Sequence, residues 1–482
     1  MCLNTLTLFN RRSTMNRFMT TSMHKKIQQE LLNGFNILLV TGAFWLCWSY
    51  FYASQITHPF YYVGNLIMVF LFGLFYYFTS HLYNGYSLPI SRIYELVYSQ
   101  ALAALISDGI LYLITILINR HYISFFPFVP TFLLQFFLIT LWTVAAHQWY
   151  FREFPPRKTV VILGQGQNVD KLVKQYGMDV HFDVQSVVPV EECLKDIPGT
   201  IGQAEVVFCC GLHSHNRNLV TKYCVAHKIG TYVIPRIGDV IMDSAKKVHL
   251  FHLPMMAVQR YNPSPEFLFF KRLYDIVLSL VALVLFAPIM AAVAVAIKMT
   301  DGGDIFYRQA RLTKDGKVFQ VLKFRSMRMD AEKDGVARLS TGENDPRVTK
   351  VGRFIRAVRF DELPQLLNIL KGDMAIVGPR PERPEISAQY AKAMPEWNLR
   401  LQAKCGLTGY AQVYGQYNTT PYDKLLLDLM YIAKPSLFED FKIIFATVKI
   451  LFMKDSTEGV AEGQVTAEVE SVHEGNMGQS FK

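Results

Sequence analysis

The chain has 482 residues, which is too long for one ordinary domain, so we expect two or three folded units. Hydrophobic residues make up 51% of the chain and aromatic residues 13%, which is high for a soluble protein and directs attention to apolar segments. The net charge of +10 favours anionic lipids or phosphorylated ligands as partners.

Four long apolar segments come first along the chain. Each holds about twenty residues, the length that a helix needs to cross a hydrocarbon core of ~30 Å. They are Gly34–Ala53, Tyr61–Leu82, Leu96–Ile118 and Phe125–Ala146. We therefore predict four transmembrane helices in residues 33–152, after a cytoplasmic segment 1–32. The first apolar run starts late and no cleavage site precedes a soluble domain, so we interpret it as an anchor and not as a signal peptide.

Basic residues near these segments indicate the orientation. Those that precede the first segment or follow the fourth are Arg11, Arg12, Arg17, Lys25, Lys26, Arg152, Arg157 and Lys158, whereas the outer loops contribute Arg120. By the positive-inside rule, the N-terminus and everything after Phe151 face the cytoplasm. A chain anchored in a bilayer in this way is not expected to bind nucleic acid.

Residues 158–257 read as a small parallel α/β domain, because TVVILGQGQ, AEVVFCCG and TYVIP resemble strands that alternate with helical stretches. Gly164 and Gly166 have the spacing of a dinucleotide-binding turn, but Val169 stands where close helix packing normally requires glycine. Two interpretations stay open: a Rossmann-like module for regulation or assembly, and a nucleotide-binding domain.

The cysteines and histidines of this region have no clear metal-site pattern. None of the seven cysteines has metal-ligand spacing, and the adjacent Cys209 and Cys210 read as buried, reduced thiols. His213 and His215 are interpreted as loop residues, with a metal site as the alternative.

A fifth apolar segment, Tyr274–Ile297, is long enough to span a membrane. Lys271 and Arg272 precede it and Lys298 follows it, so charge gives no orientation. Pro288 lies near its middle, where a proline removes a helical hydrogen bond and favours a bend. We predict a re-entrant helical hairpin over 274–297 that keeps the rest of the chain cytoplasmic; a crossing helix is the alternative.

The C-terminal apolar stretch Leu437–Met453 carries Lys442 and Lys449 one heptad apart. It suits a helix lying in the membrane interface or, equally, an amphipathic helix packed on the domain core. Residues 455–482 are acidic and small and read as a disordered tail.

Catalytic chemistry between the fifth segment and the tail must rely on carboxylates, because no histidine occurs between His252 and His473 and Cys405 is the only cysteine there. Basic residues are abundant instead and suit phosphate-bearing ligands. They include Arg308, Arg311, Lys323, Arg325, Arg328, Arg347, Lys350, Arg353, Arg356, Arg359, Arg380 and Arg383.

The stretch DELPQLLNILKG carries the candidate nucleophile. Its leucines predict an amphipathic helix that begins at about Asp361, because Pro364 fits only a first turn, and ends at Gly372. Asp361 is then either an N-cap or a nucleophile whose ionised form the helix dipole favours. Glu362 could hold a divalent cation such as Mg²⁺ together with phosphate oxygens.

The loop GPRP follows this helix and supplies the opposite charge. Pro379 and Arg380 each precede a proline and are therefore pushed to extended backbone angles, so Arg380 is presented by a stiff loop that ends at Pro381. Its planar guanidinium matches a phosphate. A purely structural rigid loop is the alternative.

Four blocks then carry a family resemblance: KRLYDIVLSLVALVLFAPIM, VFQVLKFRSM, DELPQLLNILKGDMAIVGPRPERP and GLTGYAQVYG. In order and spacing they resemble the bacterial polyprenyl-phosphate sugar-1-phosphate transferases, the phosphoglycosyl transferases with one re-entrant membrane helix. The close match runs from residue 271 to about 454. The front of the chain resembles the long form of that family, which starts capsule, exopolysaccharide or O-antigen synthesis.

The resemblance implies a membrane protein with a four-helix transmembrane domain, a Rossmann-like cytoplasmic domain and a mainly α catalytic domain over 266–454. It further implies that Asp361 attacks the β-phosphorus of a UDP-sugar, releases UMP and forms a sugar-phosphoryl aspartate, which undecaprenyl phosphate then attacks. Glu362 would bind Mg²⁺. The substrate-binding candidates are Lys323, Arg325, Arg308, Pro379, Arg380 and Pro381.

The resemblance also implies the bacterial cytoplasmic membrane, contact with the lipid bilayer and a homodimer. The residues VRF before the dyad and Cys405 depart from the common family pattern, and bear on acceptor or sugar preference. Glucose and galactose are the expected sugars. The alternatives are a non-catalytic membrane scaffold for polysaccharide assembly and a membrane-bound nucleotide-dependent oxidoreductase.

Overall fold

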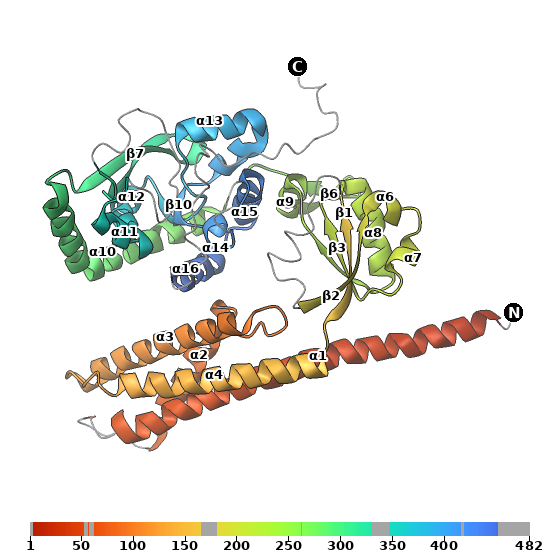
Figure 1. Ribbon diagram of the computed structural model, residues 1–482, viewed down its shortest axis with the longest axis horizontal. Coiled ribbons are helices and arrows are strands. Elements are labelled where there is room, and N and C mark those ends of the chain that lie inside the picture. Colours follow the sequence, from red (N-terminus) through yellow and green to blue (C-terminus); the bar gives the residue numbers. More distant parts are fainter. Residues whose placement is uncertain are drawn as a thin grey trace. The chain divides into compact units, whose positions relative to one another are not determined.

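The computed structural model describes residues 3–52, 56, 62–164, 181–261, 263–328, 347–415 and 419–451. Gly166, Val169 and the predicted tail 455–482 lie outside these residues. The chain divides into two compact units, Met1–Tyr232 and Val233–Lys482. Figure 1 shows the elements of both.

Four long helices in the first unit cover the four predicted apolar segments. They are α1 (Leu3–Cys47), which continues into the π-helical turn η1 (Trp48–Tyr52), α2 (Tyr62–Leu82), α3 (Ile93–Asn119) and α4 (Phe128–Glu153). All four contain stretches long and apolar enough to cross a membrane, and so does α10 in the second unit. The first helix begins at Leu3, far ahead of the predicted start of the first span.

A buried amide network joins all four helices of this bundle. Asn36 on α1 accepts a hydrogen bond from the Tyr76 hydroxyl of α2 at 2.8 Å and donates to Gln100 of α3 at 3.1 Å. The Gln100 carbonyl also accepts from Thr143 on α4 at 3.1 Å. Polar side chains that satisfy one another in this way hold apolar helices together where the surroundings offer no competing water.

The α/β part of the first unit is a four-stranded sheet in the order β2-β1-β3-β4. Its strands are β1 (Arg157–Leu163), β2 (Phe182–Pro189), β3 (Val206–Cys210) and β4 (Gly230–Val233), and β1 runs parallel to both neighbours. Short helices α6 (Val190–Cys193), α7 (Ile197–Ile201) and α8 (Ser214–Ala226) connect them. The predicted parallel α/β arrangement is therefore present.

Two glycines pack closely at the end of β1 in this sheet. A Cβ on Gly164 would lie 2.2 Å from the carbonyl oxygen of Gly211, so this glycine is required for strand packing whether or not a nucleotide binds. Cys209 and Cys210 are buried as predicted, and burial raises the pKa of the Cys210 thiol to about 11. His213 is the N-cap residue of α8.

The second unit begins with helix α9 (Ile237–Asp243), whose Val240 belongs to the core of this unit. The boundary between the two units thus falls inside the predicted α/β domain 158–257, whose bounds stay a prediction. A hairpin of β5 (Lys246–Leu250) and β6 (Leu253–Ala257) follows.

Helix α10 (Pro265–Asp301) contains the segment 274–297 that we predicted as a re-entrant hairpin, and its membrane course stays a prediction. It is one uninterrupted helix with Pro288 inside, and Figure 1 shows its two arms diverging at a bend. Residues such as Leu278 pack on the main core, whereas Val293 and Ile297 pack on a separate cluster around Ile355. Val284 between the arms is 77% exposed, so the bend presents apolar surface.

The remaining elements surround the main core. The hairpin β7 (Phe306–Leu312) and β8 (Val318–Phe324) encloses turn η3 (Lys314–Gly316). Then follow α11 (Lys350–Ala357), η4 (Phe360–Glu362), α12 (Gln365–Lys371), β9 (Ala375–Val377), α13 (Pro384–Ala393), η5 (Pro395–Gln402), β10 (Gly406–Thr408), α14 (Tyr410–Val413), α15 (Pro421–Ala433) and α16 (Leu437–Leu451). Strands β9 and β10 pair in parallel.

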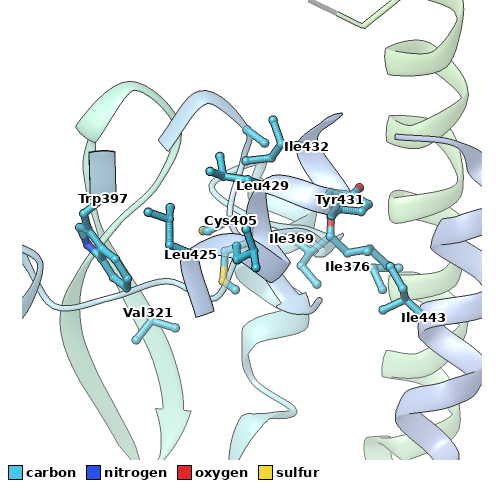
Figure 2. Packing of buried hydrophobic residues seen from close by; sticks show 14 of the residues in the cluster. Val321, Ile369, Ile376, Trp397, Cys405, Leu425, Leu429, Tyr431, Ile432 and Ile443 are labelled. Atoms are coloured by element: carbon cyan, nitrogen blue, oxygen red, sulfur yellow. Dashed lines mark hydrogen bonds between the residues drawn. The ribbon is translucent and has the colours of Figure 1, made fainter. Parts of the chain in front are cut away.

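Figure 2 shows the core of this unit, where Leu425 and Leu429 of α15 meet Ile369, Ile376 and Trp397. Helix α16 packs on the core, as one of the two interpretations of its sequence predicted, and its place in the membrane interface stays a prediction. Its Ile443 is fully buried in the core, whereas Phe438 on the other face is 59% exposed.

Candidate active site

The Asp361-Glu362 pair lies in the 3₁₀ turn η4, between α11 and α12. We predicted one helix from about Asp361; α12 instead begins at Gln365 with Pro364 as its N-cap, and it ends at Gly372 as expected. The N-cap of η4 is Arg359, which has a left-handed backbone (φ 55°). Neither N-cap makes a side-chain capping hydrogen bond. Asp361 is therefore not the cap of either helix.

Two cations approach Glu362 from different elements. Lys323 Nζ on β8 donates to Glu362 Oε1 at 2.9 Å, and Arg380 Nη2 from the loop after β9 lies 3.8 Å from the same oxygen. Lys323 and Arg380 were both predicted site residues. The fold brings Lys323 to Glu362 across 39 residues of sequence and Arg380 across 18. The site thus contains two carboxylates and two positively charged side chains.

The two carboxylates have opposite pKa shifts. Burial, followed by the neighbouring Glu362 charge, raises the pKa of Asp361 to about 6, although Lys323, Arg356 and Arg380 oppose the shift. Burial acts in the same direction on Glu362, but Lys323 and Arg380 outweigh it and hold the pKa of Glu362 below its ordinary value. Glu362 is therefore the charged member of the pair at lower pH, while Asp361 ionises close to neutrality.

Glycines fix the GPRP loop against β10. A Cβ on Gly378 would lie 2.3 Å from the Lys404 carbonyl oxygen, and one on Gly409 would lie 2.1 Å from the Gly378 carbonyl oxygen. The amide N–H of Gly406 donates to the Pro379 carbonyl at 2.9 Å. The backbone approach that these contacts require leaves no room for a side chain at Gly378.

Two arginines hold the next two carbonyls of the same loop. Arg400 donates to the Arg380 carbonyl at 2.8 Å, and Arg311 donates to the Pro381 carbonyl at 3.0 Å. Arg400 is itself paired with Asp428 at 2.6 Å, and the side chains are 4% and 1% exposed. The main chain under the Arg380 side chain is thus fixed by charged hydrogen bonds, while that side chain stays 43% exposed.

Arg325 and Arg308 lie elsewhere on the β7–β8 hairpin region. Arg325 is buried and close to Gly303, where an added Cβ would lie 2.2 Å from its Nη1. Arg308 is exposed on β7 and pairs in register with Leu322. Their part in substrate binding stays a prediction.

Sequence reasoning did not single out several residues that the structure brings to this site. Arg356 lowers the pKa of Asp361, and Arg359 lowers that of Glu362. Both are among the basic residues named from the sequence. Only their position, five and two residues before Asp361, could have indicated that they lie near the site. Arg400 of η5, which contacts the GPRP loop, and its ion-pair partner Asp428 of α15 left no local pattern in the sequence.

The comparisons with known proteins match this part of the chain. The family model "Bacterial sugar transferase" matches residues 267–454. A "UDP-glucose:undecaprenyl-phosphate glucose-1-phosphate transferase" of Escherichia coli (strain K12) is 40% identical over 212 residues, which cover 43% of this chain and 44% of that relative. A "UDP-N-acetylgalactosamine-undecaprenyl-phosphate N-acetylgalactosaminephosphotransferase" of Aeromonas hydrophila is 36% identical over 231 residues, covering 47% and 53%.

A shorter relative is matched over most of its length. The "UDP-glucose:undecaprenyl-phosphate glucose-1-phosphate transferase" of Caulobacter vibrioides is 42% identical over 191 residues, which cover 39% of this chain and 71% of the relative. The matched part thus spans about half of the two longer relatives and most of the shorter one. It includes α10, the dyad turn and the GPRP loop. On this evidence the chain belongs to the bacterial sugar transferase family.

Proposed function

We propose that this protein transfers a hexose 1-phosphate from a UDP-sugar to undecaprenyl phosphate and thereby starts the synthesis of a cell-surface polysaccharide. The single observation that carries the proposal is the pair Asp361-Glu362, in which Lys323 and Arg380 hold Glu362 ionised and burial leaves Asp361 poised near neutrality. The names of the relatives support the choice of undecaprenyl phosphate as acceptor.

In the first step, an ionised Asp361 oxygen attacks the β-phosphorus of the UDP-sugar. A bond forms between that oxygen and phosphorus, the bond to the bridging diphosphate oxygen breaks, and UMP leaves with the electron pair. Lys323 and Arg380 lie where they can bind the diphosphate and offset its charge. In the second step, a phosphate oxygen of the lipid attacks the sugar-phosphoryl aspartate and Asp361 leaves as a carboxylate.

Mg²⁺ fits this site as a companion of the donor diphosphate. Among the described residues, no group of three or more histidine, cysteine or acidic side chains could hold a metal ion, so these residues alone do not offer a complete set of ligands. Mg²⁺ commonly needs only one or two carboxylates when phosphate oxygens complete its shell. Glu362 would supply the carboxylate, and the bound ion would offset the charge of the leaving UMP.

We further propose that α10 enters the membrane and returns on the same side. Its two arms pack on clusters of one and the same unit, and the apolar residues near Pro288 are exposed. Exposed Phe438 on α16 would lie in the interface. This arrangement lets a lipid acceptor that stays in the bilayer meet a nucleotide donor that stays in water.

Three finer points belong to the same proposal. Helices α1 to α4 would be the transmembrane domain, with the α/β part on the cytoplasmic side as a Rossmann-like regulatory or assembly module. The protein would act as a homodimer in the bacterial cytoplasmic membrane. The sugar would be glucose or galactose; the Escherichia coli relative is named for glucose and the Aeromonas relative for N-acetylgalactosamine, so the family does not determine it.

The test uses the full chain in nanodiscs with undecaprenyl phosphate, Mg²⁺ and a panel of UDP-sugars. UMP release is expected with one or two of the sugars and should disappear in Asp361→Asn. The control Asp243→Asn removes an exposed carboxylate that pairs with Lys434, and it should keep full activity. Absence of UMP release with every sugar would favour the scaffold alternative, and turnover in Asp361→Asn would reject the covalent step.

A further inference from the structure

We infer that Asn368 is a positioning residue that holds strand β8, and with it Lys323, in register with the catalytic turn; this inference rests on the proposed function for its catalytic consequence. The residue lies on α12, six residues after Glu362, and only 7% of it is exposed.

The carboxamide of Asn368 bonds two backbone groups of β8. Its Oδ1 accepts from the N–H of Leu322 at 2.9 Å, and its Nδ2 donates to the carbonyl of Gln320 at 2.8 Å. Only one orientation of an amide group satisfies both bonds, and no other side-chain type offers one donor and one acceptor in this plane at this length. The side chain thus completes the edge of β8 that faces away from β7.

These two bonds and the Lys323–Glu362 contact join the same two segments. Leu322 is the direct neighbour of Lys323 in β8, while Asn368 and Glu362 lie on the same turn-and-helix segment. One link is ionic and lies in the site; the other is an amide link outside it. Because both span β8 and the segment 360–371, a shift of β8 that breaks one must strain the other.

The amide link matters when substrate arrives. Lys323 can bind the donor diphosphate only if its ammonium leaves Glu362 or is shared with the phosphate, and the ionic link then weakens. The two Asn368 bonds do not involve any charged group of the site, so they keep β8 in place during that exchange. Arg272 fixes the C-terminal end of α12, next to Asn368, by donating to the carbonyls of Ile369 and Leu370 at 2.6 and 2.7 Å.

Gln402 offers a matched control in the same unit. Its Oε1 accepts from the N–H of Tyr261 at 3.0 Å and its Nε2 donates to the Leu399 carbonyl at 2.9 Å, so it also joins backbone groups through both ends of its amide. Gln402→Leu and Asn368→Leu therefore remove the same kind of interaction. Of the two residues, only Asn368 forms these bonds with β8.

The first experiment needs no enzymatic activity. Thermal unfolding of the full chain in nanodiscs is compared for Asn368→Leu, Lys323→Met and the double variant. We expect the decrease in Tm of the double variant to be about 2–4 °C smaller than the sum of the two single decreases, because Lys323 contributes less once β8 is released. Gln402→Leu and Lys323→Met should add to within about 1 °C. Additive decreases for Asn368 would overturn the inference, whatever the reaction proves to be.

The second experiment measures UMP release against pH. In Asn368→Leu, a displaced Lys323 lowers the pKa of Asp361 less, so the acid limb should move to higher pH by about half a unit or more, with kcat about tenfold lower and the KM for the UDP-sugar little changed. Gln402→Leu should leave the acid limb in place. An unshifted profile in Asn368→Leu would mean a structural role only. Absence of release in the wild type would instead reject the proposed function.

Discussion

Lys271 on α10 and Asp440 on α16 form a buried ion pair across 169 residues of sequence, with Nζ 2.7 Å from Oδ2 and the aspartate side chain fully buried. The hydroxyl of Tyr431 donates to the second carboxylate oxygen at 2.8 Å, and Tyr274 also donates to the group. The first arm of α10 is thus fastened to the core by a fully satisfied carboxylate.

Breaking this pair should destabilise the second unit strongly. Lys271→Met leaves the Asp440 charge buried without its cation, which costs about 3–5 kcal/mol in comparable buried pairs. Thermal unfolding in nanodiscs would measure the loss. Lys298→Met, on an exposed lysine of the same helix, should change stability by no more than about 0.5 kcal/mol. Equal effects of the two variants would contradict the importance of the pair.

The pH dependence of UMP release should follow Asp361. In the proposed reaction Asp361 must be ionised to attack phosphorus, so the rate is expected to rise with pH through about 6. Glu362→Gln removes the nearby negative charge that raises the pKa of Asp361, and the acid limb should therefore move to lower pH even though kcat falls. A limb that stays in place, or moves up, would show that Glu362 does not act on Asp361 in this way.

Replacing Asp361 should raise the stability of the fold although it removes the proposed activity. The pKa of Asp361 is raised to about 6 in the folded state from an ordinary 3.8, so the folded chain binds more protons between these values and its stability falls as pH rises through that window. Asp361→Asn removes this effect and should stabilise the second unit at pH 7 by about 1–2 kcal/mol. The gain should vanish at pH 3.5. A variant less stable than wild type at pH 7 would contradict the raised pKa.

Gly378→Ala should damage the site through the backbone. The added Cβ would lie 2.3 Å from the Lys404 carbonyl oxygen, so β9 and β10 must separate, at a cost of about 1–3 kcal/mol. Arg380 follows directly, and its displacement should lower kcat by about 100-fold. Gly238→Ala is the control, because no atom lies within 4 Å of its Cβ and alanine favours helix α9. Unfolding and UMP release measure both effects.

The sequence contained the parts of the fold that depend on local patterns. Apolar length located α1 to α4, and the run around Pro288 located a bend, although the helix there is continuous. Asp361, Glu362 and Arg380 could be named as candidates in advance because a proline-started helix and a proline-flanked arginine are readable over a few residues, whereas Lys323 was named through the family resemblance of its block.

Long-range side-chain to backbone bonds could not be predicted in this way. Arg311 reaches the Pro381 carbonyl across 70 residues, and Asn368 reaches Gln320 across 48. A single arginine or asparagine in a helix or strand carries no periodic signal, and its partner is a backbone group that every residue possesses. Helix α9 also packs on α15, and this was missed because its one buried residue, Val240, is too short a pattern.

The way in which the GPRP loop is anchored has a consequence for diversification. Its carbonyls at 379, 380 and 381 accept hydrogen bonds from Gly406, Arg400 and Arg311, so distant positions fix the course of the loop together with its own prolines. Neighbouring surface residues can then mutate without changing the course of the loop main chain. In the proposed reaction, this separation would let the preferred hexose change while the phosphate-binding backbone stays the same.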